Sequence, residues 1–281
     1  VGSEMCIRDR RSIDGADVTT RGADISVRHG GQTFTLSPQV DIAGARPDFV
    51  LTWPGSDVHG IAIFTDGRAF HATAANNRVA DDAVKRMRVR RAGYIVLSIT
   101  DADLDQDAAR QVAPDGTRSS GDLPPFVDQG MVQQWADCGI QFRELEPILR
   151  ATPLEILVRV VRRAKTDRLR RLGKELPRLL VPMVDRSVLT TPGQVASERL
   201  GANLLDGTRP APYTDPLQLA VVRGCDELAI VGMLGASRMS LTLVLDDREE
   251  ALRRESSAES WRAWLHLANL AQGCSLYTYD A

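Results

Sequence analysis

The chain has 281 residues, 26% of them charged, and a formal net charge of −2. This length is sufficient for one large domain or two modest ones, each with a real hydrophobic core. The overall charge gives no signal for a protein that binds polyanions, but it conceals two basic runs. Residues 78–91 hold six basic and two acidic residues, and residues 159–178 hold nine basic and two acidic ones. Two basic faces are therefore expected.

The cysteines and the apolar runs bear on location. The four cysteines are far apart and form no Cys-x-x-Cys pair, so neither a disulfide framework nor a zinc site is indicated and a reducing cytoplasm is expected. No apolar run reaches membrane-spanning length, and no membrane partner is expected. Residues 1–10 look like translated sequencing adapter and lack the apolar core of a signal peptide. We expect the natural protein to extend further at its N-terminus.

The first strands and one helix are expected before residue 105. Residues 11–33 are polar and Gly-rich, with weak strand character at 23–28. Clearer strands follow at 33–36, 48–53 and 60–65, the last two separated by the turn signal Pro54-Gly55-Ser56-Asp57. A helix is expected over 78–92, capped by Asn76 or Asn77 and stopped by Gly93. Its predicted apolar face holds Val79, Ala80, Ala83, Val84 and Met87. The apolar run 94–100 is typical of a strand buried on both faces.

The second half is expected to begin after a linker over residues 106–123, which are rich in Asp, Gly, Ser and Pro. Helices are expected over 142–180, short strands near 217–222, 228–234 and 240–245, and a terminal helix over 248–271. The predicted fold class is α/β. Residues 11–105 would form a mixed sheet flanked by helices, and residues 124–281 a smaller C-terminal α+β domain.

Acidic residues stand at the ends of two predicted strands. If the turn pairs Trp53 with Gly60 in a hairpin, Asp48 lies opposite Thr65, and a slip of one residue puts it opposite Asp66. Directly opposed residues lie roughly 4.5–5.5 Å apart. Mg²⁺ needs one or two carboxylates beside the substrate phosphate. Asp48, Thr65 and Asp66 are therefore candidate ligands for Mg²⁺, with Mn²⁺ as a second possibility, and the sequence does not decide the register.

His71 and Lys85 are the further catalytic candidates, beside Asp48 and Asp66. An imidazole could orient the attacking water or protonate the leaving oxygen, and Lys85 could supply a cation to the reacting phosphate. Each has a structural alternative, because His71 could be half-buried and Asp81–Lys85 and Asp82–Arg86 are both i,i+4 pairs worth about 0.2–0.5 kcal/mol. Candidate nucleic-acid contacts, or simply solvated surface, are Arg68, Arg78, Arg86, Arg88 and Arg90.

Together these residues resemble the PD-(D/E)XK nuclease superfamily, and within it the very-short-patch-repair endonucleases. Pro47-Asp48 resembles the Pro-Asp pair of that branch. Phe64-Thr65-Asp66-Gly67 with Phe70-His71 resembles its third-strand tip and aromatic-His element. The spacing of Asp82, Lys85, Val89, Gly93, Tyr94 and Val96 is similar to its helix-strand unit.

The resemblance implies a restriction-endonuclease-like core that hydrolyses DNA with Mg²⁺, using Asp48, Thr65, Asp66 and His71. The context resembles the end of large bacterial DEAD/DEAH-type helicases, which implies an N-terminal helicase region of the same parent chain as a partner, in DNA repair or phage defence. Two departures favour an inactive alternative that only binds nucleic acid or positions a helicase. Arg68 replaces the lysine of the acid-x-Lys element, and the helix before the first strand is absent or truncated. A protein-interaction domain is a third option.

Overall fold

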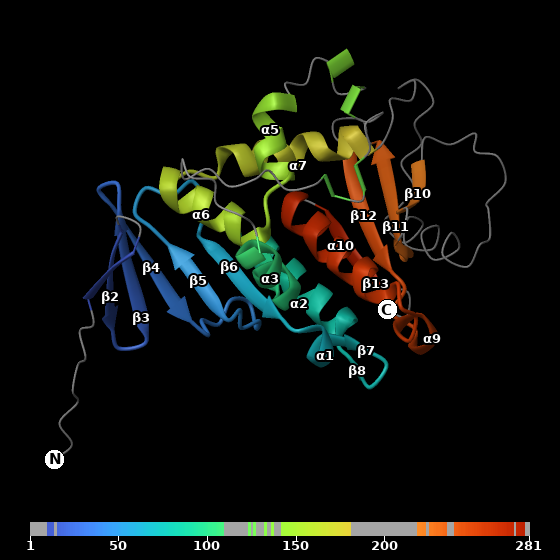
Figure 1. The fold of residues 1–281 in the computed structure, drawn as a ribbon, viewed down its shortest axis with the longest axis horizontal. Helices are drawn as coiled ribbons and strands as arrows, with labels where there is room; N and C mark the ends of the chain where they lie inside the picture. The colour runs from blue at the N-terminus through green and yellow to red at the C-terminus, as the bar shows by residue number, and fades with distance from the viewer. Residues whose placement is uncertain are drawn as a thin grey trace.

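The computed structural model is a mixed α/β protein (Figure 1). The structure describes residues 10–13, 16–109, 123–124, 126–127, 132–133, 136–137, 142–180, 218–222, 225–234, 239–272 and 274–278. Residues 1–9 of the predicted adapter segment and 110–122 of the predicted linker lie outside this set. Within it, no helix combines the length and the apolar character needed to cross a membrane.

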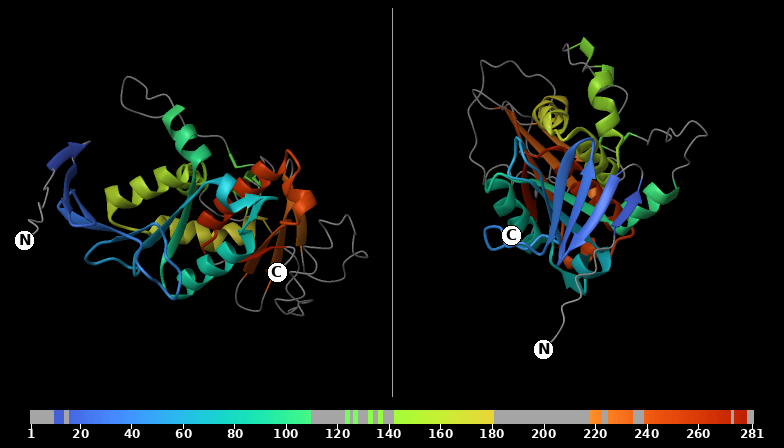
Figure 2. Two further views of the ribbon diagram at one scale, coloured as in Figure 1. Left: turned by 90° about the horizontal axis from the view of Figure 1, so that it is seen from below. Right: turned by 90° about the vertical axis from the view of Figure 1, so that its left-hand side faces the viewer.

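A seven-stranded mixed sheet dominates the first half, in the order β1-β2-β3-β4-β5-β6-β9. Its strands are β1 (Arg10–Ile13), β2 (Ala16–Arg21), β3 (Asp24–His29), β4 (Gln32–Pro38), β5 (Phe49–Thr52), β6 (Ile61–Asp66) and β9 (Ile95–Thr100). β6 and β9 pair in parallel and the other neighbours are antiparallel. Figure 2 shows β1–β4 curling away from the rest of the molecule. The predicted α/β class is confirmed at this level.

The two faces of β6 and β9 contact different layers, because side chains alternate along a strand. Ile61, Ile63 and Leu97 belong to the larger hydrophobic cluster. Ala62 and Val96 belong to a smaller one with Val89 of α2 (Val79–Arg91). All six residues of β9 are buried, as the apolar run 94–100 predicted.

The β5–β6 register differs from both predicted alternatives. Phe49 pairs with Ile63 and Leu51 with Ile61, which is the last pair before the turn. Gly60 lies outside this ladder, and its backbone lies against the carbonyl of Leu51: a Cβ on Gly60 would stand 2.8 Å from that oxygen. Asp48 therefore precedes β5 and is directly opposite neither Thr65 nor Asp66.

The buried face of α2 also differs from the predicted one. Val79 and Ala83 are buried as expected, but Val84 is exposed and Arg86 and Val89 are buried instead. The predicted Asp82–Arg86 pair is not formed, since Arg86 turns inward to Asp66. The predicted boundaries hold better, because α2 begins at Val79 and Gly93 follows the helix with a positive φ of 86°. The N-cap is Arg78 and neither predicted asparagine, although Asn77 accepts a hydrogen bond from the Val79 backbone.

The second half surrounds a buried helix, α10 (Ser257–Leu270), which contacts both β9 and β11 (Figure 1). A four-stranded sheet has the order β10-β11-β12-β13. Its strands are β10 (Gln218–Val222), β11 (Cys225–Leu234), β12 (Met239–Leu245) and β13 (Ser275–Thr278). The helices are α5 (Phe142–Leu149), α6 (Pro153–Arg163), α7 (Asp167–Leu180) and α9 (Glu249–Leu252).

Most predicted elements of this half are present, with three differences. β13 was not predicted, the terminal helix is broken into α9 and α10, and Gln106–Ala109 of the predicted linker belong to helix α3 (Asp101–Ala109). Trp261 and Trp264 of α10 are buried in the shared core. One hydrophobic cluster includes residues from Phe34 to Cys274, so the two halves share a core. The domain boundary stays a prediction.

Two side-chain amides of the C-terminal region form hydrogen bonds with the backbone groups along the outer edge of β9. Asn269 accepts from the Ser98 amide at 2.7 Å and donates to the Ser98 carbonyl at 2.7 Å. Gln272 does the same for Val96, at 3.0 and 2.9 Å. An edge strand offers unpaired backbone groups, and here the amides take the place of a further strand.

The corner between α6 and α7 is fixed to the β5–β6 turn. Trp53 donates to the Ala164 carbonyl, and Thr166 and Arg170 donate to the Asp57 carboxylate. Partial burial raises the pKa of Asp57, but the hydrogen bonds from Thr166 and Arg170 outweigh it and the net pKa lies below the ordinary 3.8. The carboxylate form is therefore the one that holds the corner.

Asn269→Leu is expected to lower the free energy of unfolding by about 2–4 kcal/mol, because two buried backbone groups of Ser98 lose their partners. Urea denaturation measures the change. Gln272→Leu is the matched control, since Gln272 is only half-buried and water can replace its bonds. Equal losses in the two variants would contradict the role of Asn269.

Asp57→Asn is expected to destabilise the protein near neutral pH by less than about 1 kcal/mol, because the carboxylate is partly exposed. A lowered pKa contributes stability above the ordinary value, and this is lost as the pH falls through the folded-state pKa. The difference from wild type should therefore shrink on acidification in urea titrations at several pH values. A difference in the free energy of unfolding that stays constant with pH would contradict the role of the Asp57 carboxylate.

Candidate functional site

An open cleft of about 500 Å³ lies where β6 ends, beside α2. It is lined by Asp41, Gly44, Arg46, Asp48, Phe64, Thr65, Asp66, His71, Arg78, Asp82 and Lys85. All the residues predicted to be catalytic or metal-binding are in this set. They come from three separate parts of the fold: the start of β5, the end of β6 with the following turn of helix, and α2.

Asp48 is joined to Thr65 despite the shifted register. Its Oδ2 accepts hydrogen bonds from the Thr65 backbone amide at 2.7 Å and from Thr65 Oγ1 at 2.9 Å. The carboxylate thus acts as an acceptor just beyond the last β5–β6 backbone pair. Its other oxygen accepts from Gln39 Nε2 at 3.2 Å. Asp48 is half-buried, so its carboxylate is both oriented and open to the cleft.

Asp66 is buried and paired with a cation that the sequence did not point to. Arg86 Nη2 lies 2.6 Å from each oxygen of Asp66, and both side chains are 3% exposed. Arg86 Nε donates to Ser98 Oγ at 2.9 Å, and its guanidinium lies 5.0 Å from the centre of the Phe64 ring. Asp66, Phe64 and Ser98 share the face of the sheet that α2 covers, so Arg86 connects α2 to both parallel strands.

His71 is held by a second acidic residue, Asp82. His71 ends the one-turn helix α1 (Arg68–His71), which leads into the hairpin β7 (Ala72–Thr73) and β8 (Asn76–Asn77). Its Nδ1 lies 2.6 Å from Asp82 Oδ2. Lys85 Nζ lies 2.6 Å from Asp81 and 3.7 Å from the other oxygen of Asp82. The expected Asp81–Lys85 pair is therefore present, and Lys85 also reaches the acid that orients His71.

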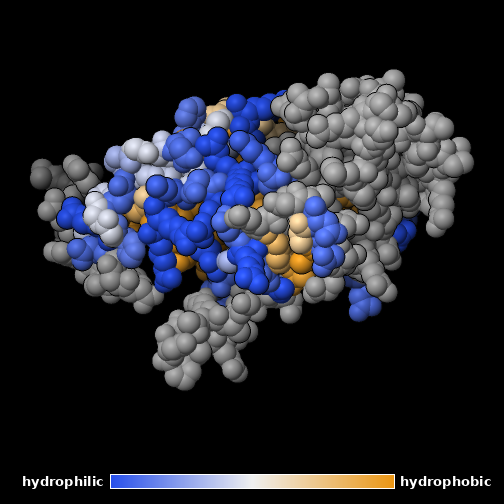
Figure 3. Space-filling model, turned by 90° about the horizontal axis from the view of Figure 1, so that it is seen from above, coloured by the Kyte–Doolittle hydropathy of each residue, from blue (hydrophilic) through white to orange (hydrophobic). Residues whose placement is uncertain are grey.

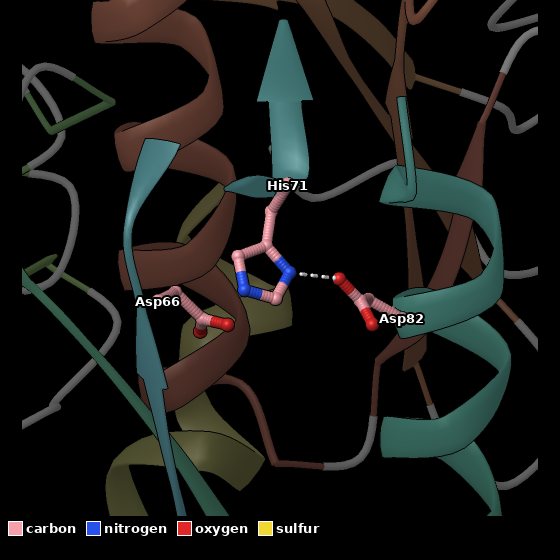
Figure 4. A group of neighbouring side chains, drawn as sticks. All are labelled: Asp66, His71 and Asp82. Atoms are coloured by element: carbon pink, nitrogen blue, oxygen red, sulfur yellow. Dashed lines mark hydrogen bonds and ion pairs between the residues drawn. The ribbon is translucent and has the colours of Figure 1, made fainter. Parts of the chain in front are cut away.

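Asp66, His71 and Asp82 form a group that can hold a metal ion. One donor atom from each lies within 4.8 Å of the others. Figure 4 shows the imidazole between the two carboxylates, with its Nδ1 toward Asp82. Arg86 takes up only part of the roughly four lone-pair sites of the Asp66 carboxylate. Two carboxylates and an imidazole are ordinary ligands of divalent cations, so the donors present fit such an ion.

The predicted nucleic-acid contacts divide into two groups. Arg68 donates to Ser257, Arg86 to Asp66, and Arg90 to the carbonyls of Ala268 and Cys274, so these three guanidinium groups make internal contacts. Arg90 also contacts the Cys274 thiol, whose pKa burial raises. Arg78 and Arg88 are exposed, and Arg78 lines the cleft.

Asp82 is the site residue that the catalytic prediction left out. The sequence presents Asp82 as one half of a helix-surface pair with Arg86, because the two are four residues apart. A local signal for its position existed in the resemblance, where Asp82 belongs to the matched helix-strand spacing. Comparison with protein-family models, with curated proteins and with solved structures gave no match. The family resemblance therefore stays a prediction.

Arg86→Met is expected to lower the free energy of unfolding by about 3–5 kcal/mol, because it leaves the Asp66 charge buried without a partner. Adding Asp66→Leu should recover much of the loss, since replacing both partners by apolar groups is often close to neutral. Lys85→Met, at a more exposed pair, should cost at most about 1 kcal/mol. Urea denaturation of the wild type, these three variants and Asp66→Leu alone measures this, and additive losses from the Arg86 and Asp66 substitutions would contradict a buried pair.

Proposed function

We propose that the cleft is the active site of a metal-dependent DNA endonuclease with a restriction-endonuclease-like core, Mg²⁺ being the proposed ion. The observation that carries the proposal is the convergence of Asp48, Thr65, Asp66, His71 and Asp82 on one cleft. These residues span 35 positions of the sequence but are gathered by the chain crossover between β6 and β9. The proposed association with a helicase rests on the resemblance alone.

The two carboxylates of the group support a divalent ion such as Mg²⁺ or Mn²⁺, and the imidazole is a donor that Mn²⁺ accepts more readily than Mg²⁺. Asp66, His71 and Asp82 would hold it, and Asp48, which Thr65 orients, would contribute a further oxygen from the same cleft. When bound, the ion supplies a Lewis acid for the scissile phosphate. Arg78 and Lys85 line the same cleft and would attract the negatively charged backbone. The site is thus acidic at its base with cations beside it.

His71 has two possible tasks that exclude each other at one moment. Asp82 occupies Nδ1, which leaves Nε2 either to ligate the ion, with Asp82 behind it as the orienting carboxylate, or to accept a proton from the attacking water. The two tasks predict different variants. If His71 ligates the ion, its substitution lowers the affinity for the ion. If His71 accepts the proton, its substitution leaves that affinity unchanged and lowers only the rate of cleavage.

A second function is favoured by the contact between Arg86 and Asp66. A cation on both oxygens of the central carboxylate lowers the negative charge available to a metal ion. Such a cleft could bind nucleic acid without cutting it. The inactive alternative and the nuclease therefore differ in whether a divalent ion can share Asp66 with Arg86.

Asp48→Ala and His71→Ala are expected to reduce Mg²⁺-dependent nicking of supercoiled plasmid, His71→Ala by about 10²–10⁴-fold. Asp105→Ala is the matched control, because Asp105 on α3 is exposed, has no partner among the described residues and does not line the cleft. Isothermal titration with Mn²⁺ in the same variants separates the two tasks of His71. No nicking by the wild type, with DNA binding intact, would favour the inactive alternative.

A further inference from the structure

Most cations of the second basic run have no partner within the fold. On α6, on α7 and in the turn between them, six exposed cations make no hydrogen bond or ion pair with the part of the chain that the structure describes: Arg159, Arg162, Arg163, Lys165, Arg168 and Lys174. We call this set the α6–α7 basic face. Among the described side chains of these two helices, Arg170 and Arg171 are paired, with Asp57 and Glu144. On α2, by contrast, Lys85, Arg86 and Arg90 are all engaged.

The helices that carry these cations are firmly held. A capping box between Thr152 and Glu155 begins α6, and Ala164 ends it with a left-handed φ of 51°. Trp53 and Asp57 bind the corner that follows. The backbone therefore needs no ordering when a ligand arrives, and only side-chain freedom would be reduced.

The composition of the face suits phosphate groups. Four of its six cations are arginines, whose planar guanidinium matches a phosphate with two parallel hydrogen bonds. α6 has 11 residues and is about 16 Å long. Duplex DNA carries one charge per roughly 1.7 Å of axis, so several phosphates fall within this length. Figure 3, which looks onto the molecule from above Figure 1, shows a band of hydrophilic side chains across the middle of this side.

The groove beneath the face is bordered by the same cations. It lies between α5, α6 and α7, with Ile148, Ile156 and Leu169 in its walls. Four of the six cations of the face also line it: Arg159, Arg163, Lys165 and Arg168. Binding through charge alone is typical of a nucleic-acid backbone.

We propose that the α6–α7 basic face binds the phosphate backbone of nucleic acid, on a surface separate from the cleft. The two regions lie at opposite ends of β6, since Asp57 of the turn before it holds α7, while Asp66 at its end lies in the cleft. Six residues of extended chain separate them by about 16 Å. The face thus holds the nucleic acid away from the position of the chemistry, and it does so whether or not the cleft cuts.

The test is fluorescence anisotropy of a labelled DNA duplex with the full chain over a range of KCl concentrations. The double variant Arg159→Gln/Arg163→Gln is expected to reduce the slope of log affinity against log salt by about two, one for each phosphate that is no longer neutralised. Arg28→Gln/Arg91→Gln is the matched control, because it removes two exposed arginines, one on β3 and one on α2, that have no partner among the described residues. The slope of this control should stay near that of the wild type.

Each other outcome overturns the proposal. Equal effects of the two double variants would mean diffuse surface charge, and no binding at low salt would remove the site altogether. Binding of polyglutamate in place of the duplex would assign the face to an acidic protein. Asp48→Ala separates this proposal from the nuclease proposal. It should lower nicking of plasmid DNA and leave the slope of log affinity against log salt unchanged. Thermal unfolding of all variants checks that they are folded.

Discussion

The contact between Arg86 and Asp66 is the interaction on which the arrangement of the cleft depends. It connects α2 to the end of β6, and through Ser98 to β9, at a depth where solvent screens the two charges little. A buried charge without its partner is strongly destabilising. The position of α2 is therefore tied to that of Asp66, and with α2 come Asp82 and Lys85. The same contact also reduces the negative charge that the Asp66 carboxylate can offer to a metal ion.

A buried ion pair of this kind is poorly visible in a sequence. Arg86 stands in a charged helix with an acid four residues before it, which is the pattern of a solvated surface pair. Its true partner is 20 residues away on a strand. The candidate cleft was indicated instead by the order of acids at strand ends, and Asp48, Asp66 and His71 do line one cleft. Asp48 and Thr65 meet even though the predicted register was wrong, because a carboxylate just beyond a strand can still reach the amide of the neighbouring strand.

The fold was predictable where a segment's own pattern decides its structure. The apolar runs of β6 and β9 and the helix between them follow from periodicity, a cap and Gly93. The predictions fail where contacts with distant parts of the chain decide the structure. β13 pairs with β12 from across the chain, and the edge of β9 is completed by Asn269 and Gln272, two amides in a helical C-terminal region. Nothing local distinguishes these amides from exposed ones.

The same reasoning applies to the two basic runs, which the sequence presents as equivalent. In the first, the helix packs on a sheet that ends in acids, and three of its six cations, Lys85, Arg86 and Arg90, have partners within the fold. In the second, Leu169, Leu172 and Leu176 supply the buried side, the acids nearby are few, and the cations remain at the surface. Net charge therefore cannot rank such runs as binding surfaces. What ranks them is how much of their charge the folded chain has already neutralised, and on that measure α6 and α7 retain more than α2.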